Sequence, residues 1–350
     1  MRRYVQQIPN KKEKMVVVTG ATGLVGSHLL LYFLQQQEKI KAVYRSEESV
    51  ERTERFLCQC GIEATVIKQL ISWEEADICN PEEVFQALKG CSKVIHCAAL
   101  VSFSPKDEIP LYRINVQGTR NVVNASLELG ISDFVHLSST AAIGSTKNNE
   151  AKTELHKWKK EEKNSVYSIT KHLAELEVYR GMEEGLSILV LNPGIIIGPG
   201  KWNEGSAELF RKIDRGLKFF TKGTNGYVDV RDVAKAAVSL PTVPDEENRF
   251  LLVAENLSYQ TVFEGIAKAL GKAAPNLEVK PWMVELAWRI DKFISVLLFK
   301  KTMVTKETAR TSMKKVRYSS QKIKSHHHFT FTPIKEAIVR TGSFYQKDFA

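Results

Sequence analysis

Short apolar runs alternate along the first half of the chain with longer segments in which apolar side chains recur every three or four residues. A run of four or five apolar residues is typical of a buried strand, whereas the longer spacing predicts a helix with one buried face. The expected strands span residues 15–19, 40–44, 65–67, 94–97, 134–137 and 187–191, of which 65–67 is the weakest. The expected helices span residues 24–37, 81–88, 115–129 and 167–184.

This order of elements indicates the fold class. Strands that are apolar throughout and are separated by helices form a parallel sheet that is covered on both faces. The sequence therefore predicts an α/β protein with a doubly wound parallel sheet, the Rossmann fold, in which ligands bind beyond the carboxyl ends of the strands. After residue 191 the alternation weakens, because residues 192–226 are rich in Gly and Pro and residues 256–350 are mostly helical or irregular.

A glycine-rich turn with the sequence TGATGLVG follows the first expected strand. Glycine permits a positive φ and lets a phosphate approach the main chain, and the N-terminus of the next helix offers unpaired N–H groups to an anion. The strand before and the helix after favour a dinucleotide site over a plain tight turn. The residues expected to hold the dinucleotide here are Gly20, Thr22, Gly23, Leu24, Val25 and Gly26.

With this Gly-x-x-Gly-x-x-Gly spacing the chain resembles the extended branch of the short-chain dehydrogenase/reductase superfamily. That branch includes nucleotide-sugar epimerases and dehydratases, dihydroflavonol-type reductases and 3β-hydroxysteroid dehydrogenases. The resemblance covers about residues 15–255. We expect a dinucleotide-binding Rossmann domain of residues 12–191 and 227–255, and a smaller interleaved, mostly helical substrate-binding region of residues 192–226 and 256–350.

The end of the second strand bears on which nicotinamide cofactor is used. An acidic residue there would bond the ribose hydroxyl of NAD, whereas Arg accommodates the 2′-phosphate of NADP. Arg45 and Ser46 stand at this place, so we favour NADP, with NAD as the second choice. The other interpretation makes Arg45 a solvated loop charge, and Glu47 and Glu48 would repel a phosphate if they faced it.

The resemblance adds cofactor contacts after three further strands. Asp77 and Ile78 match the family's pair at the adenine, Ala98 and Ala99 match its segment beside the cofactor, and Pro193 and Gly194 match its loop along the nicotinamide. His96 precedes the two alanines, and we interpret it as structural, because a strand histidine before small residues is more often buried than reactive.

The sequence YSITK places Tyr167 and Lys171 four residues apart, on one face of the expected helix. A phenol has a pKa of about 10 and is a weak acid or base at neutral pH. An adjacent ammonium and an oxidised nicotinamide would lower that pKa, which suits a proton donor in carbonyl chemistry. The pair is therefore predicted to be catalytic, with both residues also contacting the cofactor.

Two further residues complete the expected catalytic set. The fifth strand ends in LSSTA, and a hydroxyl at this carboxyl end can hold a substrate oxygen near the phenol. By similarity to the family's motif we choose Ser139, with Ser138 and Thr140 as alternatives. Asn115 matches a family position that shapes the site, although an Asn at a helix start is also a common N-cap.

The charge balance argues against a nucleic-acid-binding protein. The chain has 350 residues, with 50 Lys and Arg against 40 Asp and Glu, or a net charge of +10. Residues 1–14 and 300–324 together carry a charge of +12, so the rest of the chain is slightly acidic. A nucleic-acid-binding core would carry a basic face of its own. We therefore expect a small-molecule substrate and no nucleic-acid partner.

The five cysteines, an odd number without a CxxC pair, favour reduced thiols and a cytoplasmic location. The polar N-terminus lacks the apolar core of a secretory signal. Three adjacent histidines at 326–328 point in different directions on either a helix or a strand, so we expect no metal site there.

Residues 281–299 predict a largely apolar helix, and the basic residues 300–324 follow it directly. Such a pairing suits peripheral contact with an anionic membrane surface through residues 281–324. Packing on the substrate-binding region or on a partner subunit is the alternative. The family resemblance also implies a homodimer formed through the helices near residues 115–130 and 167–184.

These observations favour an NAD(P)-dependent oxidoreductase that transfers a hydride between the nicotinamide and a carbonyl or hydroxyl carbon. The apolar, Trp-containing C-terminal part suits a medium-sized, partly apolar substrate. A nucleotide-sugar epimerase or dehydratase that holds NAD tightly is the first alternative, and a non-catalytic NADP-sensing protein is the second.

Overall fold

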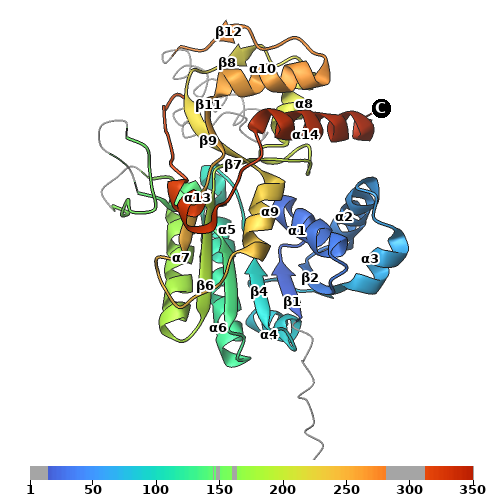
Figure 1. Ribbon diagram of the computed structural model, residues 1–350, viewed down its shortest axis with the longest axis vertical. Helices are drawn as coiled ribbons and strands as arrows, with labels where there is room; N and C mark the ends of the chain where they lie inside the picture. Colours follow the sequence, from blue (N-terminus) through green and yellow to red (C-terminus); the bar gives the residue numbers. More distant parts are fainter. Residues whose placement is uncertain (1–14, 145, 147–149, 160–163, 281–311, 350) are drawn as a thin grey trace, which may run out of the picture.

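A seven-stranded, fully parallel sheet forms the larger part of the molecule (Figure 1). The computed structural model describes residues 15–144, 146, 150–159, 164–280 and 312–349. In spatial order the strands are β10 (Arg249–Leu252), β6 (Ser187–Pro193), β5 (Asp133–Leu137), β4 (Lys93–His96), β1 (Val16–Thr19), β2 (Ile40–Tyr44) and β3 (Ile71–Glu75). The strand order reverses between β1 and β4, which is where a doubly wound sheet binds its ligand.

Helices cover both faces of this sheet, which confirms the predicted fold class. They are α1 (Leu24–Gln35), α2 (Glu47–Gln59), α3 (Ala64–Leu70), α4 (Pro81–Leu88), α5 (Glu108–Leu111), α6 (Thr119–Glu128), α7 (Val166–Glu183) and α9 (Val230–Ser239). Short helical turns lie at Pro105–Asp107 (η1) and Thr140–Ala142 (η3), and a π-helix lies at Tyr112–Gly118 (η2).

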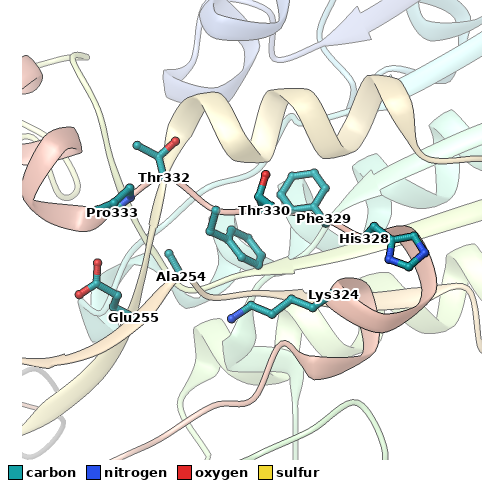
Figure 2. Close-up of a pocket in the computed structure, with 9 residues that line it drawn as sticks. Ala254, Glu255, Lys324, His328, Phe329, Thr330, Thr332 and Pro333 are labelled. Carbon is teal, nitrogen blue, oxygen red and sulfur yellow. The ribbon is translucent and has the colours of Figure 1, made fainter.

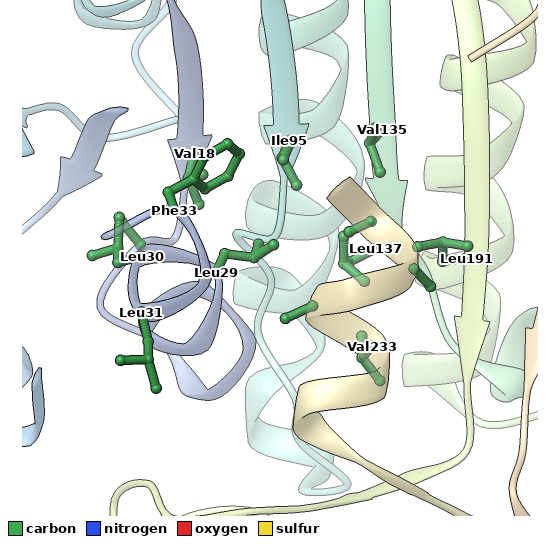
Figure 3. Packing of buried hydrophobic residues seen from close by; sticks show 14 of the residues in the cluster. Val18, Leu29, Leu30, Leu31, Phe33, Ile95, Val135, Leu137, Leu191 and Val233 are labelled. Carbon is green, nitrogen blue, oxygen red and sulfur yellow. The ribbon is translucent and has the colours of Figure 1, made fainter. Parts of the chain in front are cut away.

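Alternation along the strands divides the core into two layers. Val18, Ile95 and Val135 point to the face covered by α1 and α9 (Figure 3). The neighbouring residues Val17 and Phe134 point to the opposite face, which α4, α6 and α7 cover. Because both faces are buried, each central strand has to be apolar throughout, and this is the pattern that revealed the strands in the sequence.

A smaller region lies beyond the carboxyl edge of the sheet (Figure 1). It contains the mixed sheet β11–β9–β7 and a two-stranded sheet of β8 and β12. Its strands and helices are β7 (Ile195–Ile197), α8 (Glu208–Asp214), β8 (Phe219–Phe220), β9 (Thr224–Asp229), β11 (Glu255–Ser258), α10 (Tyr259–Leu270), β12 (Leu277–Glu278), α13 (Gln321–His327) and α14 (Ile334–Phe349). Helices α8, α10 and α14 bury their own apolar cluster around Phe210 and Ile266.

The structure corrects the sequence prediction at one strand. The strand expected at residues 65–67 is wrong, because these residues lie in helix α3 and the third strand is Ile71–Glu75. Val66 and Ile67 pack against the cluster beneath α1 as one helical face. Strand β3 lies at the edge of the sheet and is only half buried, so it lacks a continuous apolar run. The seventh strand, β10, was not anticipated.

Candidate active site

The turn after β1 is built on glycines that no other residue could replace without a backbone shift. Gly20 has a φ of +67°, and a Cβ at this position would lie 2.7 Å from the Ala98 backbone. A Cβ on Gly26 would lie 2.2 Å from the carbonyl oxygen of Gly20. The Gly23 amide donates to that same oxygen at 3.0 Å. The turn therefore folds tightly on itself and against the residues that follow β4.

Helix α1 begins at this turn without a capping side chain. Its N-cap is Gly23, and the Ser27 amide makes the first helical hydrogen bond, to the Gly23 oxygen at 2.9 Å. The amides of the first helical turn, including those of Leu24 and Val25, therefore have no acceptor within the helix. These amides and the dipole of a twelve-residue helix fit the pyrophosphate of a dinucleotide.

Tyr167 and Ser139 meet at the carboxyl end of β5. Tyr167 is the second residue of α7, which Ser165 caps by accepting from the Ser168 amide at 2.9 Å. The Ser139 hydroxyl lies close enough to the Tyr167 hydroxyl to lower the pKa of the phenol, and the Tyr167 ring meets Phe103 edge-on with centroids 5.5 Å apart. Burial raises the pKa of the Tyr167 phenol, and the nearby Ser139 hydroxyl opposes that shift. The phenol is therefore protonated at neutral pH and is a weaker acid than a free phenol.

Lys171 lies one turn further along α7 and is buried. Its Nζ donates to the backbone oxygen of Leu137 at 2.8 Å. Burial lowers the pKa of this ammonium to about 8, and the carboxylate of Glu175 opposes the shift. The structure thus places the amine at the end of β5, two residues before Ser139.

Asn115 lies inside the π-helix η2 and is not an N-cap. Its side chain accepts from the Leu100 amide at 2.7 Å and donates to the Leu100 oxygen at 3.0 Å and to the Thr170 hydroxyl at 3.1 Å. It therefore ties the loop after β4 to the helix that carries Tyr167 and Lys171. Single π-turns of this kind often occur at functional sites.

The two alternatives to Ser139 are engaged elsewhere. The Ser138 hydroxyl donates to the buried carboxylate of Glu175. The Thr140 side chain is hydrogen-bonded with Tyr318, which lies in the segment before α13, and burial raises the pKa of Tyr318 to about 12. Among the described residues, Ser139 Oγ accepts from the nearby Ala141 amide at 3.1 Å and lies beside the Tyr167 hydroxyl. Of the three hydroxyls, Ser139 is thus the one beside the phenol.

His96 is buried and has a structural set of contacts. Its Nδ1 lies 2.6 Å from the Thr19 hydroxyl, and its Nε2 lies 3.0 Å from the hydroxyl of Thr119. The Thr119 hydroxyl donates to the backbone oxygen of Asn115 at 2.6 Å, so toward His96 it acts as an acceptor. Nε2 therefore carries the ring proton. Burial lowers the pKa of His96 to about 3, which agrees with a neutral ring.

The remaining predicted cofactor residues follow β2, β3, β4 and β6 at the same edge of the sheet. Arg45 is exposed directly after β2, and Ala98 and Ala99 follow β4. Asp77 accepts from the Cys79 amide at 2.9 Å, and Ile78 is buried, with its side chain over Gly118. Pro193 ends β6, and a Cβ on Gly194 would lie 2.4 Å from the Gly226 oxygen. These residues share one edge, while their roles remain predictions.

One residue near Arg45 was not singled out from the sequence. Arg52, on α2, has a buried Nη2 that has no hydrogen-bond partner among the described residues. At the start of the same helix, Glu47 accepts from the Tyr44 hydroxyl at 2.6 Å, which raises the pKa of Tyr44 to about 12. The only signal for Arg52 in the sequence is a second Arg seven residues after Arg45.

A shallow pocket of about 520 Å³ lies elsewhere, between α13 and the segment that leads into α14 (Figure 2). Lys324 extends along it from α13, and Phe329, Phe331 and Glu255 line it. None of the predicted site residues lines this pocket. In the part of the chain that the structure describes, no cluster of His, Cys, Asp or Glu could hold a metal ion.

The comparison with protein families decides the identity of the fold. A model of the "NAD dependent epimerase/dehydratase family" matches residues 16–252, which include the glycine turn, Ser139, Tyr167 and Lys171. The chain belongs to this family. It is accordingly an oxidoreductase of the extended short-chain dehydrogenase/reductase type, and NAD(P) is the cofactor typical of the family.

Several curated relatives of this family member are reductases by name. A protein of Synechocystis sp. named "Putative dihydroflavonol 4-reductase" is 27% identical over 336 residues, which are 94% of each chain. Cinnamoyl-CoA reductase 1 of Arabidopsis thaliana is 29% identical over 266 residues, or 73% of this chain and 74% of the relative.

Solved structures of low sequence identity share the fold. The crystal structure of gox2253 has a TM-score of 0.76 at 23% identity and covers 96% of this chain and 98% of its own. The Bordetella bronchiseptica enzyme WbmH in complex with NAD+ has a TM-score of 0.71 at 17% identity and covers 95% and 98%.

Four predictions about the surroundings and the organisation of the chain stay open. Within the described part of the chain, no helix combines the length and the apolar character that crossing a membrane requires. The apolar helix expected at residues 281–299 and the first part of the basic segment after it, residues 300–311, lie outside the described residues. Membrane contact through residues 281–324, the homodimer, the cytoplasmic location and the division into two regions remain predictions.

Proposed function

We propose that this family member is an NADP(H)-dependent reductase that interconverts a carbonyl and a hydroxyl group on a medium-sized, partly apolar substrate. The observation that carries the proposal is the neighbouring pair of hydroxyls on Tyr167 and Ser139. It lies at the same edge of the sheet as the uncapped N-terminus of α1. The named cinnamoyl-CoA and dihydroflavonol reductases among the relatives support a reductase rather than an epimerase.

In this mechanism the chain aligns and protonates, and a bound nicotinamide supplies or accepts the hydride. Ser139 donates a hydrogen bond to the substrate oxygen and holds it beside the phenol. Tyr167, kept protonated by burial, gives its proton to that oxygen as the carbonyl is reduced. Lys171 provides a positive charge at the end of β5 that favours the phenolate left behind.

Tyr167→Phe tests the acid role most directly. It removes the hydroxyl and retains the ring contact with Phe103. Turnover of a carbonyl substrate with NADPH should fall by about 10²–10⁴-fold. The affinity for NADP+, measured by fluorescence titration, should change little. A variant that keeps more than about a tenth of wild-type turnover would refute general acid catalysis by Tyr167.

The choice of NADP rests first on Arg45, which is exposed directly after β2. A 2′-phosphate would give its guanidinium group an anion to bind, and Arg52, whose buried Nη2 has no partner among the described residues, is the second candidate. Arg45→Gln and Arg52→Gln should each weaken NADP+ binding about tenfold and leave NAD+ binding nearly unchanged. Arg55→Gln, an exposed position on the same helix, is the matched control and should alter neither.

The same titrations separate the reductase from the epimerase alternative. An exchangeable cofactor with preference for NADP(H), together with turnover in a panel of carbonyl compounds, supports the reductase. NAD that remains bound through purification, with no net redox turnover, would overturn the proposal in favour of an epimerase or dehydratase.

A further inference from the structure

A buried ion pair lies directly behind the predicted catalytic residues and takes no part in the mechanism described so far. Glu175 stands one helical turn after Lys171 on α7, and only 1% of its side chain is exposed. Arg249, the first residue of β10, donates from Nη2 to Glu175 Oε2 at 2.7 Å. Taking two charges out of water costs free energy, and an apolar pair of similar volume would be as stable or more stable. Stability alone therefore does not account for this ion pair.

The carboxylate of Glu175 joins four elements of the site. Its Oε1 accepts from the Ser138 hydroxyl at the end of β5 and from the amide of Asn192, in β6, at 2.6 Å. The same Asn192 amide donates to the backbone oxygen of Ser139 at 2.9 Å. Arg249 Nε in turn donates to Asn192 Oδ1 at 3.0 Å. Glu175 is thus connected both to α7 and to the backbone of the residue that faces Tyr167.

We propose, on the basis of the proposed reductase function, that Glu175 and Arg249 are positioning residues for the catalytic set. Glu175 locks α7 against the ends of β5 and β6, so that Tyr167 meets Ser139, and its negative charge keeps Lys171 in the ammonium form. Arg249 balances that charge and limits its effect on Lys171. Neither residue touches the reacting atoms.

The titratable and charged groups around Lys171 determine how readily its ammonium loses a proton. Glu175 on its own helix favours the ammonium, whereas the thiol of Cys97 after β4 is uncharged, because burial raises its pKa. The imidazoles of His96 and His136, on β4 and β5, lie close enough for Lys171 to lower their pKa values, and both rings are buried and neutral. Glu175 is therefore the principal negative charge that acts on Lys171, and Arg249 is the cation that opposes it.

This arrangement predicts opposite responses to the loss of either partner. Glu175→Gln removes the negative charge, so the ammonium is less favoured and its titration moves to lower pH. Arg249→Gln leaves the carboxylate uncompensated, so the same titration moves to higher pH. A nearby charge typically shifts a pKa by about one to three units, so each midpoint should move by about one pH unit.

The experiment compares these two variants with the wild type across pH 6–10. Two readouts are taken: kcat and kcat/KM for carbonyl reduction, and the affinity for NADP+ by fluorescence titration. The alkaline midpoint of both should fall in Glu175→Gln and rise in Arg249→Gln. Glu175→Asp keeps the charge but shortens its reach, so it should lower kcat and leave the midpoint in place.

Glu177→Gln is the matched control, because Glu177 lies on the same helix and pairs at the surface with Arg120 and Arg180. It should leave the midpoints and the turnover unchanged. If the role of the two residues is merely structural, both variants lose activity and thermal stability, and their midpoints do not move in opposite directions. That result would overturn the proposal. If only one variant folds, its midpoint shift alone decides, since each has a stated sign.

Failure of the proposed function looks different. A wild type with no carbonyl turnover would refute the reductase. The pH dependence of its NADP+ affinity would still report whether Glu175 and Arg249 govern Lys171.

Discussion

His136 in the centre of the sheet offers the sharpest test of the energetics of this fold. It lies on β5 opposite His96 on β4, with ring centroids 5.5 Å apart. The side chain is 1% exposed, and neither ring nitrogen has a hydrogen-bond partner among the described residues. Burial and the charge of Lys171 hold its pKa well below 6.5. We therefore predict that His136→Leu, an apolar change of similar size, stabilises the protein.

The size of the gain depends on pH in a way that can be worked out. Unpaired buried polar atoms cost about 1–3 kcal/mol, which sets the gain at pH 7. Below an unfolded-state pKa of 6.5 the unfolded chain binds a proton that the folded chain refuses, so wild-type stability falls with pH. For one such histidine the linkage amounts to about 2 kcal/mol between pH 7 and pH 5. The stability advantage of His136→Leu over the wild type should therefore be about 2 kcal/mol larger at pH 5 than at pH 7.

The assay is urea unfolding of wild type and variant at pH 7, 6 and 5, followed by far-UV circular dichroism. The variant should still lose stability on acidification, because burial also lowers the pKa of His28 to about 4 and that of His96 to about 3. His326→Gln, at an exposed position, is the control and should follow the wild type. Equal pH dependence in His136→Leu and wild type would refute the assignment of His136 as a buried neutral ring.

Three further predictions concern the site and its support. Because burial lowers the pKa of Lys171 to about 8, the ammonium is lost as pH rises through that value, and kcat/KM for carbonyl reduction should decline there; a flat profile to pH 10 would contradict this. Gly26→Ala places a Cβ 2.2 Å from a backbone oxygen and should lower Tm and abolish cofactor binding in calorimetric titration, whereas Gly61→Ala, with open space around it, should cost only about 1 kcal/mol and leave binding intact. Arg340→Ala removes the nearer of the two cations beside the fully buried Asp229, leaving Arg231 with its Nε at 3.8 Å, and should lower the free energy of unfolding by about 3 kcal/mol in urea titration; a loss below 1 kcal/mol would show that the pair is dispensable.

The local pattern of the chain determined the central sheet. The strands at residues 15–19, 40–44, 134–137 and 187–191 were found because a strand buried on both faces has to be apolar at every position. The glycine turn and the Tyr167–Lys171 spacing were visible for the same kind of reason. Each is a geometric requirement that is met within a few consecutive residues.

Tertiary structure decided what depends on partners far along the chain. Edge strand β3 has no distinctive pattern, because pairing with one neighbour places few demands on its side chains. Strand β10 is different, because its residues Phe250–Leu252 are apolar and buried although the strand was not anticipated. The sequence could not show that Asn115 would sit in a π-helix bonded to Leu100, 15 residues away. The contact between Glu175 and Arg249 joins residues 74 positions apart. The sequence around a charged residue does not indicate which distant residue will pair with it. Such pairs form only when the strands and helices pack together in the folded chain.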